Sequence, residues 1–162
     1  MRCILSIDVE DWFHILDVPK APEISEWDRL PSRVEVGMRK LLEILAEANL
    51  QATFFFLGWI AERNRHLVLE TQRCGHEIAS HGYTHELVYK MGADRFLEDA
   101  RRSKAILEDL TGKRVLGFRA AGFSLTESTP WFYDKLIEAG YAYDSSLFPA
   151  SRQHGGMRVT TT

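Results

Sequence analysis

Residues 78–85 have the sequence IASHGYTH, which combines the end of a strand with a candidate site. The apolar first half is typical of a buried strand, and Gly82 then separates two histidines. If the chain becomes helical after Gly82, His81 and His85 lie on one face, because residues four apart share a face of a helix. Two such imidazoles make half of a divalent-metal site, which a carboxylate could complete. The alternative is a helix start with two exposed histidines.

Short apolar runs alternate along the chain with segments of helical periodicity. The runs predict strands at residues 3–7, 52–57, 76–80, 115–118 and 141–143. The periodic segments predict helices at 34–49, 59–63, 66–74 and 94–110, and a last helix that is capped by Thr126 or Ser128, has Pro130 near its first turn and runs to Ala139. Alternating strands and helices predict a parallel sheet, either open and doubly wound or curled toward a barrel.

Two features surround the first predicted helix. Residues 17–31 contain three prolines and scattered charges, which indicates a long loop over the end of the first strand. Ser32 is followed three places later by Glu35, and this spacing is typical of a capping box at a helix start.

Polar, chemically capable residues follow four of the five predicted strands. They are Asp8 and Glu10, then His81 and His85, then Arg119, and last Asp144. Ligands gather at the carboxyl ends of parallel strands, in open sheets and in barrels alike. The pattern therefore favours a single site, although Asp144 with its two following serines is also typical of a turn.

The residue types suggest a hydrolytic site. Asp8 and Glu10 are two apart, so in an extended backbone they point the same way. One carboxylate can join the two histidines around a metal, and the other can take a proton from water. Arg119 is a natural partner that fixes the orientation of the free carboxylate. Such a set hydrolyses an amide or an ester.

Composition excludes several other classes. The chain has 162 residues, 45% of them hydrophobic, which fits one globular domain. A net charge of -3 gives no electrostatic case for a nucleic acid partner, and no apolar run approaches the ~20 residues of a membrane span. Because Asp8 comes too early for a signal-peptide core, we expect a cytoplasmic protein. The only cysteines, Cys3 and Cys74, are expected to be reduced thiols.

Three motifs resemble those of the polysaccharide deacetylase family, the NodB-homology carbohydrate esterases. They are SIDVE at residues 6–10, SHGYTH at 80–85 and GFR at 117–119. The segments GHEI at 75–78 and YDSS at 143–146 are similar to the DVED-type branch of that family. The resemblance covers essentially residues 3–149.

The resemblance implies a fold, an activity and a set of roles. The family fold is a deformed TIM-like (β/α) barrel, of which about five β/α units would be present in a single domain over residues 1–162. Asp8 takes the role of the general base, and Arg119 holds it. The metal ligands are Glu10, His81 and His85. The ion would be Zn²⁺, with Co²⁺ or Mn²⁺ as alternatives, and the substrate an N-acetylated carbohydrate.

Three departures from the family pattern matter. Glu10 stands where many relatives have aspartate, so the adjacent Asp11 is a competing ligand. Ala120 follows Arg119 where a proline is common. The late Leu-x-His motif with the general acid does not occur before Thr162, and His154 in the Gly-rich tail is not assigned that role. We therefore expect an incomplete barrel that lacks its C-terminal part, or one completed by a partner or an oligomer.

The functional hypothesis is a metal-dependent hydrolase that removes N-acetyl groups from a polysaccharide or glycan precursor, with Asp8 as general base. One alternative is a metal-independent hydrolase of a cyclic or linear amide on the same fold. Another is a non-catalytic carbohydrate-binding relative. His14, nearest the acids, is a weaker candidate, and three aromatic residues are candidates either for a sugar-binding groove or for packing: Trp12, Phe13 and Trp59.

Overall fold

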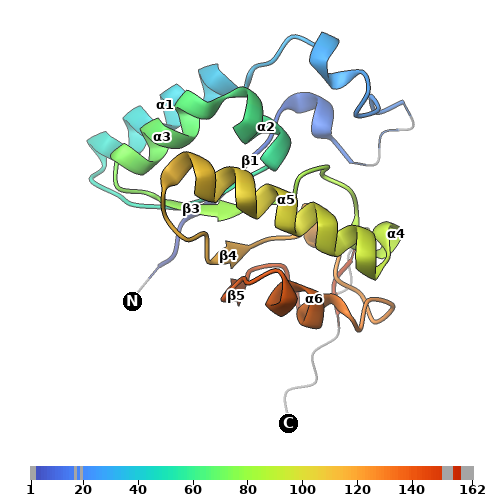
Figure 1. The fold of residues 1–162 in the computed structure, drawn as a ribbon. Coiled ribbons are helices and arrows are strands. Elements are labelled where there is room, and N and C mark those ends of the chain that lie inside the picture. Colours follow the sequence, from blue (N-terminus) through green and yellow to red (C-terminus); the bar gives the residue numbers. More distant parts are fainter. Residues whose placement is uncertain (1–2, 17, 19, 151–154, 158–162) are drawn as a thin grey trace.

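The computed structural model describes residues 3–16, 18, 20–150 and 155–157, and its five strands form one parallel sheet (Figure 1). The strand order is β1-β2-β3-β4-β5, with the bounds Ser6–Val9, Thr53–Phe56, Glu77–Ser80, Gly117–Phe118 and Tyr143–Asp144. Each strand pairs with the next strand in the sequence, so the sheet is built from successive crossovers. The predicted alternation of strands and helices is confirmed.

Five helices follow the strands in the predicted order. They are α1 (Val34–Glu47), α2 (Gly58–Arg63), α3 (Arg65–Arg73), α5 (Ala93–Thr111) and α6 (Phe132–Glu138). A short helix before α5, α4 (Val88–Met91), was not predicted. Three short 3-10 helices, which the sequence did not predict, are η1 (Trp12–His14), η2 (Trp27–Arg29) and η3 (Ala121–Phe123). Among the described helices, none combines the length and the apolar character needed to cross a membrane.

The sheet does not close into a barrel within the described residues. β1 and β5 are its two edges, and each has only one neighbouring strand. Exposed apolar side chains lie at both edges, with Ile4 and Leu5 before β1 and Leu147 after β5. This is the incomplete (β/α) barrel that the sequence predicted.

Some boundaries differ from the prediction. The first strand is shifted, so that Asp8 lies inside β1 rather than after it. The last helix begins at Phe132 with Trp131 at its N-cap, so the predicted caps Thr126 and Ser128 are wrong. The carbonyl of Thr126 instead accepts two hydrogen bonds from Thr129, one from its amide at 3.1 Å and one from its hydroxyl at 2.8 Å. The polar side chains there stabilise a turn, which competes with helix formation.

The two faces of the sheet differ in what covers them. The core lies between one face and the helices, and it joins strand residues such as Phe54, Phe56 and Phe118 to Leu67 of α3 and Phe96 of α5. Figure 1 shows α1, α3 and α5 alongside the strands. Because side chains alternate along a strand, the residues between these face the opposite way. That opposite face carries Ser6, Asp8 and Phe55, and the candidate site lies at its carboxyl edge.

The capping box predicted for Ser32 and Glu35 is wrong, since α1 has no cap from either side chain. The carboxylate of Asp11 serves the helix start instead. It accepts hydrogen bonds from the amides of Arg33 and Val34, at 3.0 and 3.3 Å, and from the hydroxyl of Ser32 at 2.5 Å. Asp11 therefore satisfies the free amides at the start of α1 from a position more than twenty residues away.

Asp11→Ala should lower the free energy of unfolding by about 2 kcal/mol, because the amides of Arg33 and Val34 at the start of α1 lose their acceptor. Urea unfolding followed by circular dichroism measures the change. Glu43→Ala, an exposed substitution on the same helix, is the control and should change the free energy by less than about 0.5 kcal/mol. Equal effects of the two substitutions would contradict the assignment.

Candidate metal and catalytic site

The two histidines of the central motif lie on a loop, so the prediction that they share a helix face is wrong. The chain from His81 to Leu87 is not helical, and α4 begins only at Val88. His85 has a φ of 54°, a left-handed conformation that is unusual for a residue with a side chain. The loop nevertheless brings the imidazoles together, with ring centroids 5.1 Å apart.

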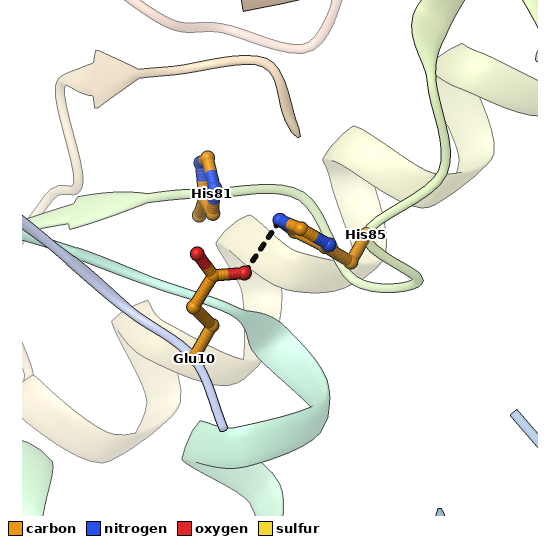
Figure 2. Close-up of side chains that lie close together, drawn as sticks. All are labelled: Glu10, His81 and His85. Atoms are coloured by element: carbon orange, nitrogen blue, oxygen red, sulfur yellow. Dashed lines mark ion pairs between the residues drawn. The ribbon is translucent and has the colours of Figure 1, made fainter. Parts of the chain in front are cut away.

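Glu10 joins the two histidines in a cluster suited to a metal ion. One ligand atom from each of Glu10, His81 and His85 lies within 4.8 Å of the others. The three side chains point toward one another in Figure 2, where the carboxylate of Glu10 contacts Nε2 of His85 at 2.7 Å. Glu10 comes from the end of β1, and the histidines come from the end of β3. Two imidazoles and one carboxylate fit the ligand set of a catalytic zinc site.

His81 is oriented for ligation by its second ring nitrogen. Its Nδ1 lies 2.8 Å from the carbonyl oxygen of Arg119, and the side chain is only 2% exposed. Since a carbonyl can only accept, Nδ1 carries the proton and Nε2 keeps a free lone pair. This is the backbone contact that metal-binding histidines commonly make. Nδ1 of His85 is buried and has no hydrogen-bond partner among the described residues.

The charges of the cluster are coupled. Burial raises the pKa of Glu10, but the hydrogen bond to His85 and the electrostatic influence of the nearby histidines outweigh it, and the net pKa lies below the usual value. Burial lowers the pKa of His81, which favours the neutral imidazole that a metal needs.

Asp8 and Arg119 form an ion pair beside this cluster. Nη1 of Arg119 donates to Oδ1 of Asp8 at 2.7 Å, while Oδ2 of Asp8 lies 4.0 Å from Nε2 of His81. Nη2 of Arg119 also donates to the hydroxyls of Ser6 and Ser145, at 2.9 and 2.7 Å. The guanidinium therefore fixes one oxygen of Asp8 and leaves the other toward the histidines.

Two other acids from the sequence analysis have different partners. Asp11, the competing ligand, is buried and its carboxylate is occupied by the start of α1. Asp144 accepts hydrogen bonds from the amide and hydroxyl of Ser146, and that hydroxyl accepts from the amide of Ala120 at 2.7 Å. The partners of Asp144 are those of a turn. The geometry favours Glu10 over Asp11 as the carboxylate ligand of a metal ion. His154 lies outside the described residues.

An open cleft of about 500 Å³ gives access to the site. Of the three aromatic candidates, Trp12 lines this cleft and is exposed, whereas Phe13 and Trp59 are buried in the core. His14 also lines the cleft, with its ring centroid 6.0 Å from that of His85. Its Nδ1 accepts from the amide of Asp11 at 2.7 Å, and burial lowers its pKa to about 3, so His14 is neutral.

The comparisons with known proteins identify the family of the chain. The family model described as "Polysaccharide deacetylase" matches residues 24–143, most of the chain. The chain therefore belongs to the polysaccharide deacetylase family. The match begins after Asp8 and Glu10, so the assignment of those two acids depends on the geometry above.

Two curated relatives carry related names. The chain is 32% identical over 113 residues to a peptidoglycan deacetylase of Helicobacter pylori. The matched region covers 70% of this chain and 38% of the relative. It is 34% identical over 73 residues to a peptidoglycan-N-acetylglucosamine deacetylase of Bacillus cereus. That match covers 45% of this chain and 26% of the relative. The chain thus spans well under half of the length of each.

The solved structures show the same fold. A candidate polysaccharide deacetylase from Mycobacterium smegmatis has 31% identity and a TM-score of 0.72, over 89% of this chain and 50% of that chain. A CE4-family pseudoenzyme from Bacillus anthracis has 18% identity and a TM-score of 0.66, over 87% of this chain and 41% of that chain. At that identity the second likeness concerns the fold alone.

Elemental analysis of the purified chain should find about one zinc or other divalent ion per chain after incubation with metal and desalting. His81→Ala should lose most of it, because only two of the three ligands remain. His66→Ala removes an exposed histidine outside the cluster and is the control. No uptake of added metal by the wild type would contradict the metal site.

Proposed function

We propose that the chain removes N-acetyl groups from a carbohydrate by metal-dependent hydrolysis, with Asp8 as the general base. The observation that carries the proposal is the placement of a free oxygen of Asp8 beside the cluster of Glu10, His81 and His85. The names of the peptidoglycan deacetylase relatives support the substrate class. A single domain over residues 1–162, a cytoplasmic location and completion by a further segment or partner stay predictions.

The residues of the chain divide the work between them. Glu10, His81 and His85 would hold a divalent ion, for which zinc suits the nitrogen and carboxylate ligands best. When bound, such an ion polarises the acetamide carbonyl and makes water more acidic. Asp8 accepts the proton of the attacking water through Oδ2, while its other oxygen stays bound to Arg119. The products are a free amine and acetate.

The shape of the site supports an oligomeric substrate. The cleft at the metal site adjoins a second cleft of about 640 Å³, and the two share His14, Ile15, Leu16 and His85 in their walls. Exposed Ile15 and Ile24 offer apolar surface for a sugar ring, and the Arg95–Glu86 ion pair offers polar groups for hydroxyls. A sugar next to the acetylated residue can occupy this second cleft.

Asp8→Asn should lower kcat on an N-acetylglucosamine oligomer by about 100-fold to 10,000-fold, because an amide cannot accept the proton. Zinc content should stay at the wild-type level, since Asp8 is not among the ligands. Release of acetate measures the rate, and Asp109→Asn, an exposed change on α5, is the control.

Acetate release and a separate measurement of sugar binding distinguish the alternatives. Full activity after removal of metal by a chelator would contradict metal dependence and favour the metal-independent amide hydrolase. Sugar binding that survives Asp8→Asn, without turnover in either protein, would favour the non-catalytic carbohydrate-binding relative.

N-acetylglucosamine oligomers should be deacetylated with a higher kcat/KM than the monomer, because only an oligomer contacts the second cleft. Arg95→Ala should lower kcat/KM on the oligomer by about tenfold and change the monomer rate little, since one charged hydrogen-bonding group is lost. Equal values of kcat/KM for the oligomer and the monomer with the wild type would contradict a role for the second cleft.

A further inference from the structure

We infer that Asp99 of α5 is a positioning residue that sets the placement of His85 relative to His81 and Glu10 in the candidate metal site. The inference rests on the proposed function, because it concerns the same site. Asp99 is not among the site residues predicted from the sequence, and it lies fourteen residues after His85.

Asp99 holds the loop between the two histidines by three hydrogen bonds. The amide of Tyr83 donates to Oδ2 of Asp99 at 2.7 Å. The amide and the hydroxyl of Thr84 donate to Oδ1 at 3.0 and 2.7 Å. Both carboxylate oxygens thus serve the two residues of the loop that lead into His85.

The residues between the histidines suit this contact. Gly82 has a φ of 73°, and a Cβ there would lie 2.9 Å from Oδ2 of Asp99. Only glycine therefore allows both this backbone conformation and the close approach of the carboxylate. Thr84 supplies the third donor. Asp99 therefore accounts for Gly82 and Thr84, although neither residue belongs to the ligand cluster.

The charge of Asp99 is compensated chiefly by the loop. Burial raises the pKa of Asp99, whereas the hydrogen bonds from Tyr83 and Thr84 lower it. Arg95 of α5, whose charge also lowers the pKa of Asp99, forms its ion pair with Glu86. A carboxylate that is costly to bury and bonded mainly to loop donors indicates that fixing the loop is its main role.

The fixed loop matters most for His85. Its backbone is left-handed, with a φ of 54°, and this conformation is strained for a residue with a side chain. The two bonds from Thr84, the residue directly before it, oppose relaxation of this conformation. His81 is held independently, because its amide donates to the carbonyl of Phe56 at 2.9 Å. Loss of Asp99 should therefore displace His85 relative to His81 and Glu10.

Asp99→Asn is the direct test, because it keeps the size of the side chain but replaces one acceptor oxygen by a donor. We expect the affinity for zinc, measured by competition with a chromogenic chelator, to fall about 10-fold to 100-fold, as for other changes around metal ligands. Glu98→Gln, an exposed change at the adjacent position of α5, is the matched control and should bind zinc like the wild type.

Two further measurements distinguish positioning from a merely structural role. Amide hydrogen exchange of Tyr83 and Thr84 in the metal-free protein should be faster in Asp99→Asn. Thr84→Val, which removes only the hydroxyl bond, should weaken zinc binding about threefold to tenfold. Its effect should be smaller in the Asp99→Asn background than in the wild type.

The outcomes are separable. If Asp99→Asn lowers the melting temperature but binds zinc within twofold of the wild type, the inference is overturned. If that variant does not fold, unchanged zinc affinity in Thr84→Val overturns it instead. If the wild type itself takes up no zinc, the metal site fails and the inference fails with it, whereas loss of activity with intact zinc binding concerns only the proposed function.

Discussion

The site geometry depends on the hydrogen bonds that the guanidinium of Arg119 makes. It is nearly buried, stacks 4.1 Å from the ring centroid of Phe55, and ties Ser6 and Asp8 of β1 to Ser145 beyond β5. A buried charge is costly unless it is paired and fully hydrogen-bonded, and here three side chains meet that demand. The same residue orients His81 through its carbonyl, so the proposed base and a proposed ligand share one support.

The register of the parallel sheet explains how Arg119 reaches so many partners. Asp8 pairs with Phe55 and Phe55 with Ala79, while the amide of Arg119 donates to the carbonyl of Ser80. Parallel strands in one register end at the same edge, so residues far apart in the sequence meet there. This is why strand-end acids and histidines, identified one by one in the sequence, could be assigned to a single site.

The sequence was sufficient where the signal is local. Apolar runs and helical periods depend on neighbours within one or two turns, so the order of elements and the strand-end residues could be predicted. The interpretation failed where long-range contacts decide the outcome. Ser32 looked like a helix cap, but Asp11 takes that place, and the helical spacing of His81 and His85 belongs to a loop. Asp99 gave no motif signal, because its partners are defined only by packing of α5 on the loop.

The two adjacent acids Glu10 and Asp11 show how environment assigns roles to like groups. Asp11 turns toward α1, and its carboxylate accepts from amides that have no other acceptor among the described residues. Glu10 turns toward the histidines, and one third of its side chain, 36%, stays open to the cleft. A metal ligand needs an oxygen that is available to the ion, whereas a carboxylate that caps a helix uses its oxygens to accept from the amides. Exchanging Glu10 and Asp11 would therefore lose both contacts. The order Glu10 then Asp11 is therefore set by the alternation of side chains at the end of β1.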